Sequence, residues 1–161
     1  MSGIKKFDVE INYSVVAEIA EKCMGQTNEI AGLLIGEWKP GPPGILKVKA
    51  QEIGESNEFT SDTFVALTDE SLVKIVQKVS SRDDDLTIVG WWHSHPGMST
   101  DFFSQQDQET QRIYQNLFPS AIGLVVDYEK EITSLDQLDL RVYQVRKGIV
   151  IEIPFKLMRG K

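Results

Sequence analysis

The stretch that decides the fold is residues 91–97, Trp-Trp-His-Ser-His-Pro-Gly. It closes an apolar run, and this pattern predicts a strand over 86–95 that stops at the proline. Successive side chains on a strand point to opposite faces. We therefore expect His93 and His95, the two histidines of the chain, to project together at a sheet edge near solvent, with Trp91 behind them.

Two neutral imidazoles on one side of a strand can supply two ligands to a zinc ion. The same pair is also compatible with two polar residues on a half-exposed strand, so a third ligand must decide. Asp107 is the candidate, three residues after Ser104 at the start of a polar helix predicted over 104–116. Ser-x-x-Asp is also an approximate capping box that any helix can use. The same geometry would let both side chains face the histidines.

Glu29 is the candidate general base. It opens the segment 29–36, Glu-Ile-Ala-Gly-Leu-Leu-Ile-Gly, which predicts a buried strand over 30–35 that ends at Gly36. A carboxylate at the entrance of a buried strand is costly unless it has a partner or a task. A site of two histidines, one aspartate and an open position for water needs such a base, because the metal lowers the pKa of that water. Alternatively, Glu29 lies just outside the strand and is solvated.

The rest of the pattern predicts an α/β fold with a mixed sheet and three helices. Further strands are predicted over 7–11, 45–53, 63–67, 121–127, 138–145 and 149–153. Residues 37–44, rich in Pro and Gly, predict a turn, and 54–62 an exposed loop. A first helix follows Asn12, and a second follows Thr68 with one apolar face formed by Leu72, Ile75, Val76 and Val79. The 104–116 helix is expected to turn inward Thr110, Ile113 and Leu117.

Composition narrows the class of protein. A chain of 161 residues is the length of one domain, so we expect a single domain over 1–161. Seventeen basic against twenty-four acidic side chains give a net charge of −7, which argues against a nucleic-acid partner. No apolar run is long enough for a signal peptide or a membrane span. The single cysteine, Cys23, fits a reducing compartment, and we expect a cytoplasmic protein.

Together these residues resemble the JAMM motif of the MPN-domain metalloproteases. The resemblance is carried by Glu29 in Glu-x-x-Gly-x-Leu-x-Gly, by residues 92–97 and by Ser104-x-x-Asp107. It extends from the first helix to the Val-Val-Asp at 125–127. Within the family, the chain looks most similar to the deubiquitinating subunit of the proteasome lid and its prokaryotic and archaeal relatives.

The resemblance implies a fold, a cofactor and an activity. The fold is a curved mixed sheet flanked by helices, similar to that of cytidine deaminases. The cofactor is one zinc ion per chain, held by His93, His95 and Asp107. The activity is hydrolysis of the isopeptide or peptide bond after the C-terminus of ubiquitin or a ubiquitin-like protein. Glu29 would be the general base and then the acid, and Ser104 would donate a hydrogen bond to the oxyanion.

One departure from the family pattern concerns the loop after His95. It carries one residue more than the family usually places before the serine, which a loop absorbs cheaply. The longer loop makes Asp101 a rival ligand, although Asp107 is preferred because it has Ser104 beside it. Loops that flank the site grip the substrate in this family, and the candidates here are residues 54–63 and 128–136.

Other functions stay open on the same residues. The zinc chemistry could act on a sulfur-carrier protein or a small peptide, as in small prokaryotic relatives. A non-catalytic MPN scaffold is the alternative from another class, although such scaffolds typically lack the His pair. The proteasome or another assembly is an expected partner, whereas a nucleic acid or a membrane is not.

Overall fold

One eight-stranded sheet organises the chain, in the order β7-β6-β5-β4-β2-β3-β1-β8. The computed structural model describes residues 7–25, 29–53, 69–97, 99–128 and 134–159, without the side chains of 69–72 and 75. The strands are β1 Phe7–Asn12, β2 Ala31–Lys39, β3 Gly44–Ile53, β4 Thr87–Ser94, β5 Ile122–Asp127, β6 Asp139–Arg146, β7 Ile149–Glu152 and β8 Lys156–Met158. The helices are α1 Tyr13–Cys23, α2 Asp69–Ser80 and α3 Gln105–Leu117, with a 3-10 turn at Leu135–Gln137.

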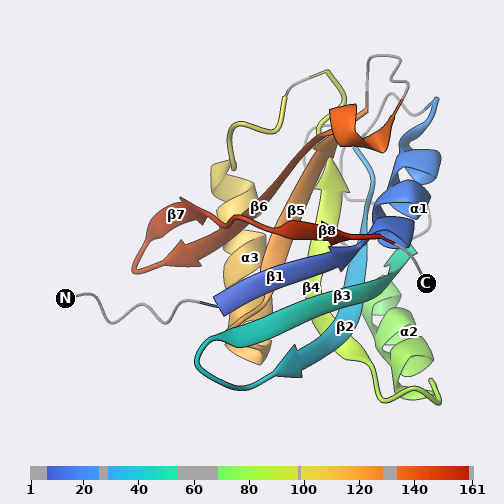
Figure 1. The fold of residues 1–161 in the computed structure, drawn as a ribbon, viewed down its shortest axis with the longest axis vertical. Helices are drawn as coiled ribbons and strands as arrows, with labels where there is room; N and C mark the ends of the chain where they lie inside the picture. The colour runs from blue at the N-terminus through green and yellow to red at the C-terminus, as the bar shows by residue number, and fades with distance from the viewer. Residues whose placement is uncertain (1–6, 26–28, 54–68, 98, 129–133, 160–161) are drawn as a thin grey trace.

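The sheet is mixed and strongly curled. β4 runs parallel to β5 and antiparallel to β2, while β1 is parallel to both β3 and β8. In Figure 1, β4 and β5 run steeply while β1 and β3 cross in front of them at a large angle. The expected α/β fold with a curved mixed sheet and flanking helices is confirmed. The short strand β8 was not predicted.

Helices cover both faces of the sheet and form two hydrophobic cores. The neighbours Trp91 and Trp92 on β4 point to opposite faces, as strand alternation requires, and belong to different cores. Trp92 packs in the core that takes the buried face of α1: Val15, Val16, Ile19, Ala20 and Cys23. Trp91 packs with Tyr114 of α3 and Val79 of α2 on the other face. The face that carries Trp91 is the one on which the site is built.

The prediction that the second strand ends at Gly36 is wrong. β2 continues to Lys39, and Glu37 and Trp38 pair with Lys47 and Leu46 of β3. A Cβ at Gly36 would lie 1.8 Å from the carbonyl oxygen of Lys47, so the glycine permits a close backbone approach at a bulge. The predicted turn is therefore shorter and lies between Lys39 and Gly44, where three of the four residues are proline.

The inward face of α3 also differs from the prediction. Ile113 and Leu117 are 57% and 75% exposed, and Thr110 is only partly buried. The buried face instead consists of Asp107, Gln111 and Tyr114. Hydrophobic patterning fails here because this helix buries polar groups that have polar partners. Gln111 accepts a hydrogen bond from Trp91 Nε1 (2.7 Å) and donates to the Ala121 carbonyl (2.8 Å) and to Gln115 Oε1 (2.8 Å).

Replacing this buried amide should destabilise the protein measurably. In Gln111→Leu the indole N–H of Trp91 loses its acceptor inside the core, which costs about 1–3 kcal/mol of unfolding free energy. Gln106→Leu, at an exposed position of the same helix, is the matched control and should change stability by less than about 0.5 kcal/mol. Urea unfolding of both variants measures the difference, and equal stabilities would show that the amide network contributes nothing.

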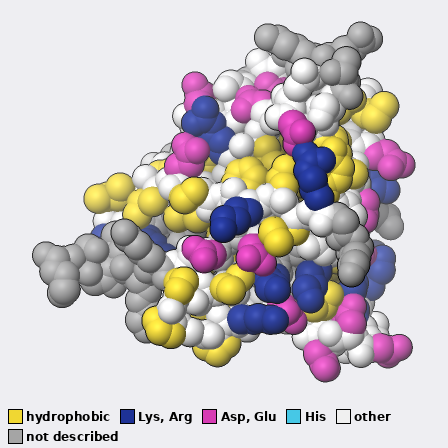
Figure 2. Space-filling view, in the orientation of Figure 1, with side chains coloured by type: hydrophobic (Ala, Val, Ile, Leu, Met, Phe, Trp, Pro, Cys, Tyr) yellow, Lys and Arg dark blue, Asp and Glu magenta, His cyan; other side chains and the backbone are white. Residues whose placement is uncertain are grey.

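Several predictions fall wholly or partly on residues 54–68, outside the described residues: the 54–62 loop, the 63–67 strand and the cap at Thr68. On α2, Val79 is buried as predicted, whereas Val76 is 41% exposed, contrary to the prediction. None of the described helices is long and apolar enough to cross a membrane. On the face drawn in Figure 2, acidic and basic side chains are interleaved and no histidine is visible.

Candidate metal centre

The two imidazoles meet as strand alternation predicts. His93 is the penultimate residue of β4, and His95 follows the strand directly, with its backbone N–H donating to the carbonyl of Val126 in β5 (2.8 Å). Both side chains are buried, so the expectation that they lie near solvent is wrong. Their Nε2 atoms lie 2.9 Å apart. Ser94 points the other way, and its Oγ accepts a hydrogen bond from the Ile30 backbone N–H (2.9 Å). This bond ties the end of β4 to the entrance of β2.

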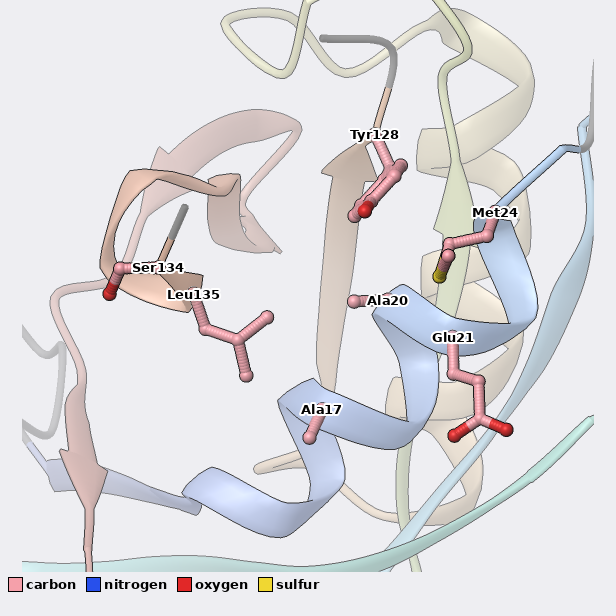
Figure 3. A pocket seen from close by; sticks show the side chains of 7 residues that line it. All are labelled: Ala17, Ala20, Glu21, Met24, Tyr128, Ser134 and Leu135. Atoms are coloured by element: carbon pink, nitrogen blue, oxygen red, sulfur yellow. The ribbon is translucent and has the colours of Figure 1, made fainter. Parts of the chain in front are cut away.

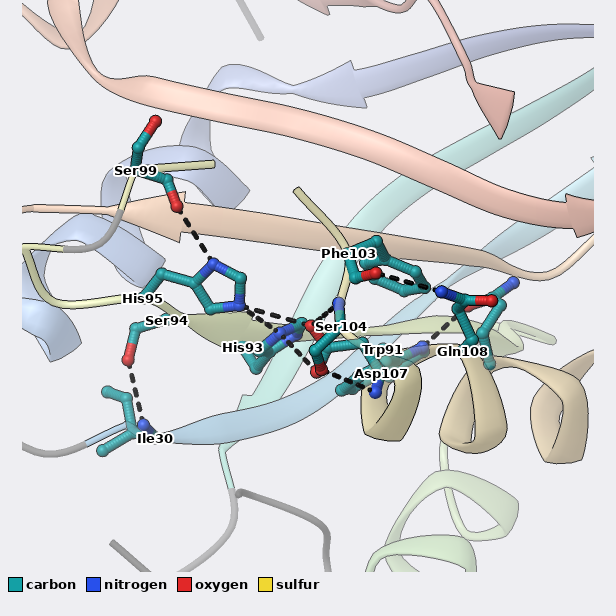
Figure 4. Close-up of polar contacts among 11 residues, drawn as sticks. Ile30, Trp91, His93, Ser94, His95, Ser99, Phe103, Ser104, Asp107 and Gln108 are labelled. Atoms are coloured by element: carbon teal, nitrogen blue, oxygen red, sulfur yellow. Dashed lines mark hydrogen bonds and ion pairs between the residues drawn. The ribbon is translucent and has the colours of Figure 1, made fainter. Parts of the chain in front are cut away.

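Asp107 lies against both histidines. Its Oδ1 is 3.1 Å from His93 Nε2, and its Oδ2 is 3.4 Å from His95 Nε2 (Figure 4). Asp107 also completes a capping box with Ser104, whose Oγ accepts from the Asp107 backbone N–H while Asp107 Oδ2 accepts from the Ser104 backbone N–H. The capping interpretation is confirmed, and the cap fixes the carboxylate in front of the histidines, where the predicted ligand would have to lie.

Glu29 lies beside the two histidines, shortly before the first residue of β2. It lies outside β2, as the alternative supposed, but it is 8% exposed, so the prediction that it is solvated is wrong. Ligand atoms of Glu29, His93 and His95 all lie within 4.8 Å of one another, a group of side chains able to hold a metal ion. Two carboxylates thus border the His pair, with Asp107 in contact with both rings and Glu29 beside them.

Burial and neighbouring charges move the pKa values of the two carboxylates apart. Burial raises the pKa of Glu29 to about 7, with Asp107 adding to the rise and His95 opposing it. Burial also acts to raise the pKa of Asp107, but hydrogen bonds with His93 and His95 outweigh it and hold that pKa well below its usual range. These contacts favour the ionised form of Asp107. A carboxyl group that titrates near neutral pH is suited to general acid–base work.

The rings of the two histidines are oriented by different contacts. His93 stacks on Trp91 with centroids 4.5 Å apart, and its buried Nδ1 has no hydrogen-bond partner among the described residues. Burial lowers the pKa of His93. His95 Nδ1 instead lies 3.0 Å from the carbonyl oxygen of Ser99. For His95, burial lowers the pKa, but hydrogen bonds with Asp107 and Ser99 outweigh burial and raise it.

The donor set fits a tetrahedral zinc ion. With bonds of about 2.0–2.1 Å, the ligand atoms of tetrahedral zinc lie about 3.3–3.4 Å apart. Here the two Nε2 atoms lie 2.9 Å apart, His93 Nε2 lies 3.1 Å from Asp107 Oδ1, and His95 Nε2 lies 3.4 Å from the other oxygen, Oδ2. Two imidazole nitrogens and one carboxylate are also a ligand set of catalytic zinc sites that keep a fourth position open.

The residues of the loop after His95 differ in how they lie relative to the site. Asp101, the rival ligand, is exposed, and no contact among the described residues joins it to either histidine. Phe102 is 41% exposed and stacks on His95 with centroids 4.7 Å apart, so it borders the site. Phe103 is buried and packs on Tyr143 and Trp91 in the core.

The predicted substrate loop 128–136 is described only at its two ends. Those ends help to line a hollow of about 310 Å³ against α1, shown in Figure 3. Its lining residues are Ala17, Ala20, Glu21, Met24, Tyr128, Ser134 and Leu135. None of them is a predicted ligand of the metal centre. The other predicted loop, 54–63, lies outside the described residues.

Sequence reasoning did not find Asp127 and Asp139. They are cross-strand partners in β5 and β6, and both accept hydrogen bonds from the segment that follows His95. Their proximity depends on the register of two strands, which no local motif reports. The available signal was a carboxylate, Asp127, at the end of an otherwise apolar strand.

Fold and site together define a class: α/β proteins in which a His-x-His strand end faces carboxylates from a helix N-terminus and a neighbouring strand. The sequence profile of the JAB1/Mov34/MPN/PAD-1 ubiquitin protease family matches residues 7–120, and the chain belongs to this family. The resemblance to MPN-domain proteins is thereby confirmed.

The individual relatives that match the chain share a low sequence identity with it. The 26S proteasome regulatory subunit RPN11 of Eremothecium gossypii is 30% identical over 107 residues, which is 64% of this chain and 32% of that protein. Ubiquitin carboxyl-terminal hydrolase RPN11 of Saccharomyces cerevisiae is 29% identical with the same coverage. NAD(+) hydrolase TcpA of a Theionarchaea archaeon is 29% identical over 140 residues, 86% of this chain and 40% of that protein. The chain thus spans well under half the length of these relatives.

Proposed function

We propose that this chain is a zinc-dependent peptidase or isopeptidase that hydrolyses the bond after the C-terminus of ubiquitin or a ubiquitin-like protein. The observation that carries the proposal is the convergence of His93, His95 and Asp107 within 3.4 Å, with Glu29 beside them. Membership in the ubiquitin protease family and the name of the yeast relative support the substrate class.

In this proposal His93, His95 and Asp107 hold the metal. When bound, zinc lowers the pKa of water and polarises the scissile carbonyl. Glu29 takes a proton from the attacking water and delivers it to the leaving amine, so that water and amide become a carboxylate and an amine. Ser104 Oγ accepts from the Asp107 N–H, but its own hydroxyl proton goes to no described residue and can therefore be donated to the oxyanion.

Cleavage of a linear ubiquitin-like fusion, with and without chelator, tests the proposal. We expect cleavage at the C-terminal bond of the ubiquitin-like unit, its loss on chelation, and its recovery when zinc is added back. A fusion to ubiquitin and a fusion to a sulfur-carrier protein, assayed side by side, distinguish the two substrate classes. Cleavage that does not depend on zinc would contradict the proposal. So would a zinc-loaded protein that cleaves neither fusion. Docking on the proteasome or another assembly is a further proposal, supported by the names of the relatives alone.

A further inference from the structure

Hydrogen bonds to Asp127, the last residue of β5, hold the segment after His95. Asp127 Oδ1 accepts a hydrogen bond from the Gly97 N–H (2.9 Å), and its Oδ2 accepts from the Ser99 N–H (3.0 Å). Both donors are backbone groups whose direction is set by the chain. The two oxygens of Asp127 therefore hold two points of the segment at once.

Asp139 holds the next residue of the same segment from β6. Its Oδ1 accepts from Thr100 Oγ1 (2.5 Å), and its Oδ2 accepts from the Thr100 N–H (3.1 Å) and from Ser99 Oγ (3.5 Å). Tyr143, also on β6, donates its hydroxyl proton to the Thr100 carbonyl. Thr100 is fully buried. Side chains of two adjacent strands, β5 and β6, thus hold Ser99 and Thr100 in place. We call the hydrogen bonds made by Asp127 and Asp139 the clamp.

The clamp fixes a carbonyl that faces His95. Ser99 has φ 68°, a left-handed conformation that non-glycine residues rarely adopt, and its carbonyl oxygen lies 3.0 Å from His95 Nδ1. A carbonyl only accepts, so Nδ1 carries the proton. Nε2, the nitrogen that faces His93 Nε2 and Asp107 Oδ2, is then the one that can offer a lone pair to a metal ion.

We propose that Asp127 and Asp139 are positioning residues of the metal centre, which act through the Ser99 carbonyl to set the tautomer and direction of His95. The inference rests on the proposed metal site but not on the substrate. It concerns His95 alone, because Trp91 stacking orients His93 and no described residue pairs with His93 Nδ1. Outer contacts of this kind typically change metal affinity 10–100-fold.

The two carboxylates should respond differently to amide substitution. In Asp139→Asn the oxygen can still accept from the Thr100 N–H, and the NH₂ can donate to Thr100 Oγ1, because a hydroxyl also accepts. In Asp127→Asn one amide oxygen faces two backbone N–H donors and the NH₂ is opposed to one of them. Asp139→Asn should therefore resemble the unsubstituted protein, while Asp127→Asn should resemble Asp127→Ala.

Two measurements test the inference. The first is the imidazole ¹⁵N shifts of metal-free protein at pH 8, where the chain has only two histidines to assign. The second is zinc affinity against a competing chelator. We expect His95 to carry its proton on Nδ1 in the unsubstituted protein. In Asp139→Ala we expect mixed tautomers and a zinc affinity about 10–100-fold weaker. Asp83→Ala, exposed in the turn before β4, is the control.

The outcomes separate this inference from the proposed function. A folded Asp139→Ala protein with the original tautomer and zinc affinity would overturn the positioning role. If the alanine variants do not fold, the asparagine pair decides, and equal zinc affinities of Asp127→Asn and Asp139→Asn would contradict the clamp. Unsubstituted protein that binds no zinc would instead refute the proposed function, while the shifts of the metal-free protein still test the clamp.

Discussion

Asp107→Ala is expected to lose stoichiometric zinc, whereas Asp101→Ala is expected to keep it. Asp107 contacts the Nε2 atoms of both histidines, while Asp101 is exposed and has no described contact with either. Loss of a ligand should weaken zinc binding by more than the 10–100-fold typical of an outer contact. Metal content after dialysis, and chelator competition on each purified variant, measure the effect.

Asp107 also caps α3, so its removal has a second consequence. The lost hydrogen bond from the Ser104 N–H should cost about 1 kcal/mol of stability. Asp107→Asn is the matched control, because its amide oxygen can still accept from the Ser104 N–H while the negative charge is gone. Weak zinc binding by both Asp107 variants, with Asp107→Asn the more stable, would separate ligation from capping. Zinc retained in Asp107→Ala but lost in Asp101→Ala would reverse the assignment.

Glu29→Gln is expected to abolish cleavage while zinc stays bound. The amide has nearly the same size and cannot accept the proton of the attacking water, so the rate should fall about 10²–10⁴-fold. Single-turnover cleavage of the linear fusion gives the rate, and metal analysis of the same preparation gives the zinc content. The variant should fold, because a neutral amide replaces a buried carboxyl group. Burial raises the pKa of that carboxyl to about 7, so its charged form is costly to bury.

The outcome of that variant also distinguishes the two carboxylates of the site. Glu29 lies within the group of side chains able to hold a metal, so it is a rival to Asp107 as a ligand. Zinc lost in Glu29→Gln and kept in Asp107→Ala would assign the ligand role to Glu29 and leave the base unidentified. Undiminished cleavage by Glu29→Gln would refute the base role directly.

Local sequence rules were sufficient where short-range geometry decides. Strand alternation placed His93 and His95 on one face, and helix capping placed Asp107 beside Ser104. The rules failed where a polar side chain finds a distant partner. Gln111 is buried because it accepts a hydrogen bond from Trp91 and donates one to the Ala121 carbonyl, while the apolar Leu117 is left exposed.

Long-range register explains the other differences. Asp127 and Asp139 meet only because β5 pairs with β6 in a particular alignment, and eleven residues lie between them in the chain. Gly36 resembles a strand terminator in the sequence, but it lies where β2 approaches the backbone of β3. Neither feature has a signature within a window of a few residues.

The zinc content of the purified, unsubstituted protein is the most direct test of the account. Plasma mass spectrometry should find about one zinc ion per chain, as expected for a site with two imidazoles, one carboxylate and an open position. A protein that stays metal-free after incubation with excess zinc and removal of the unbound metal would contradict the central claim, because His93, His95 and Asp107 would then be a hydrogen-bonded cluster without a metal.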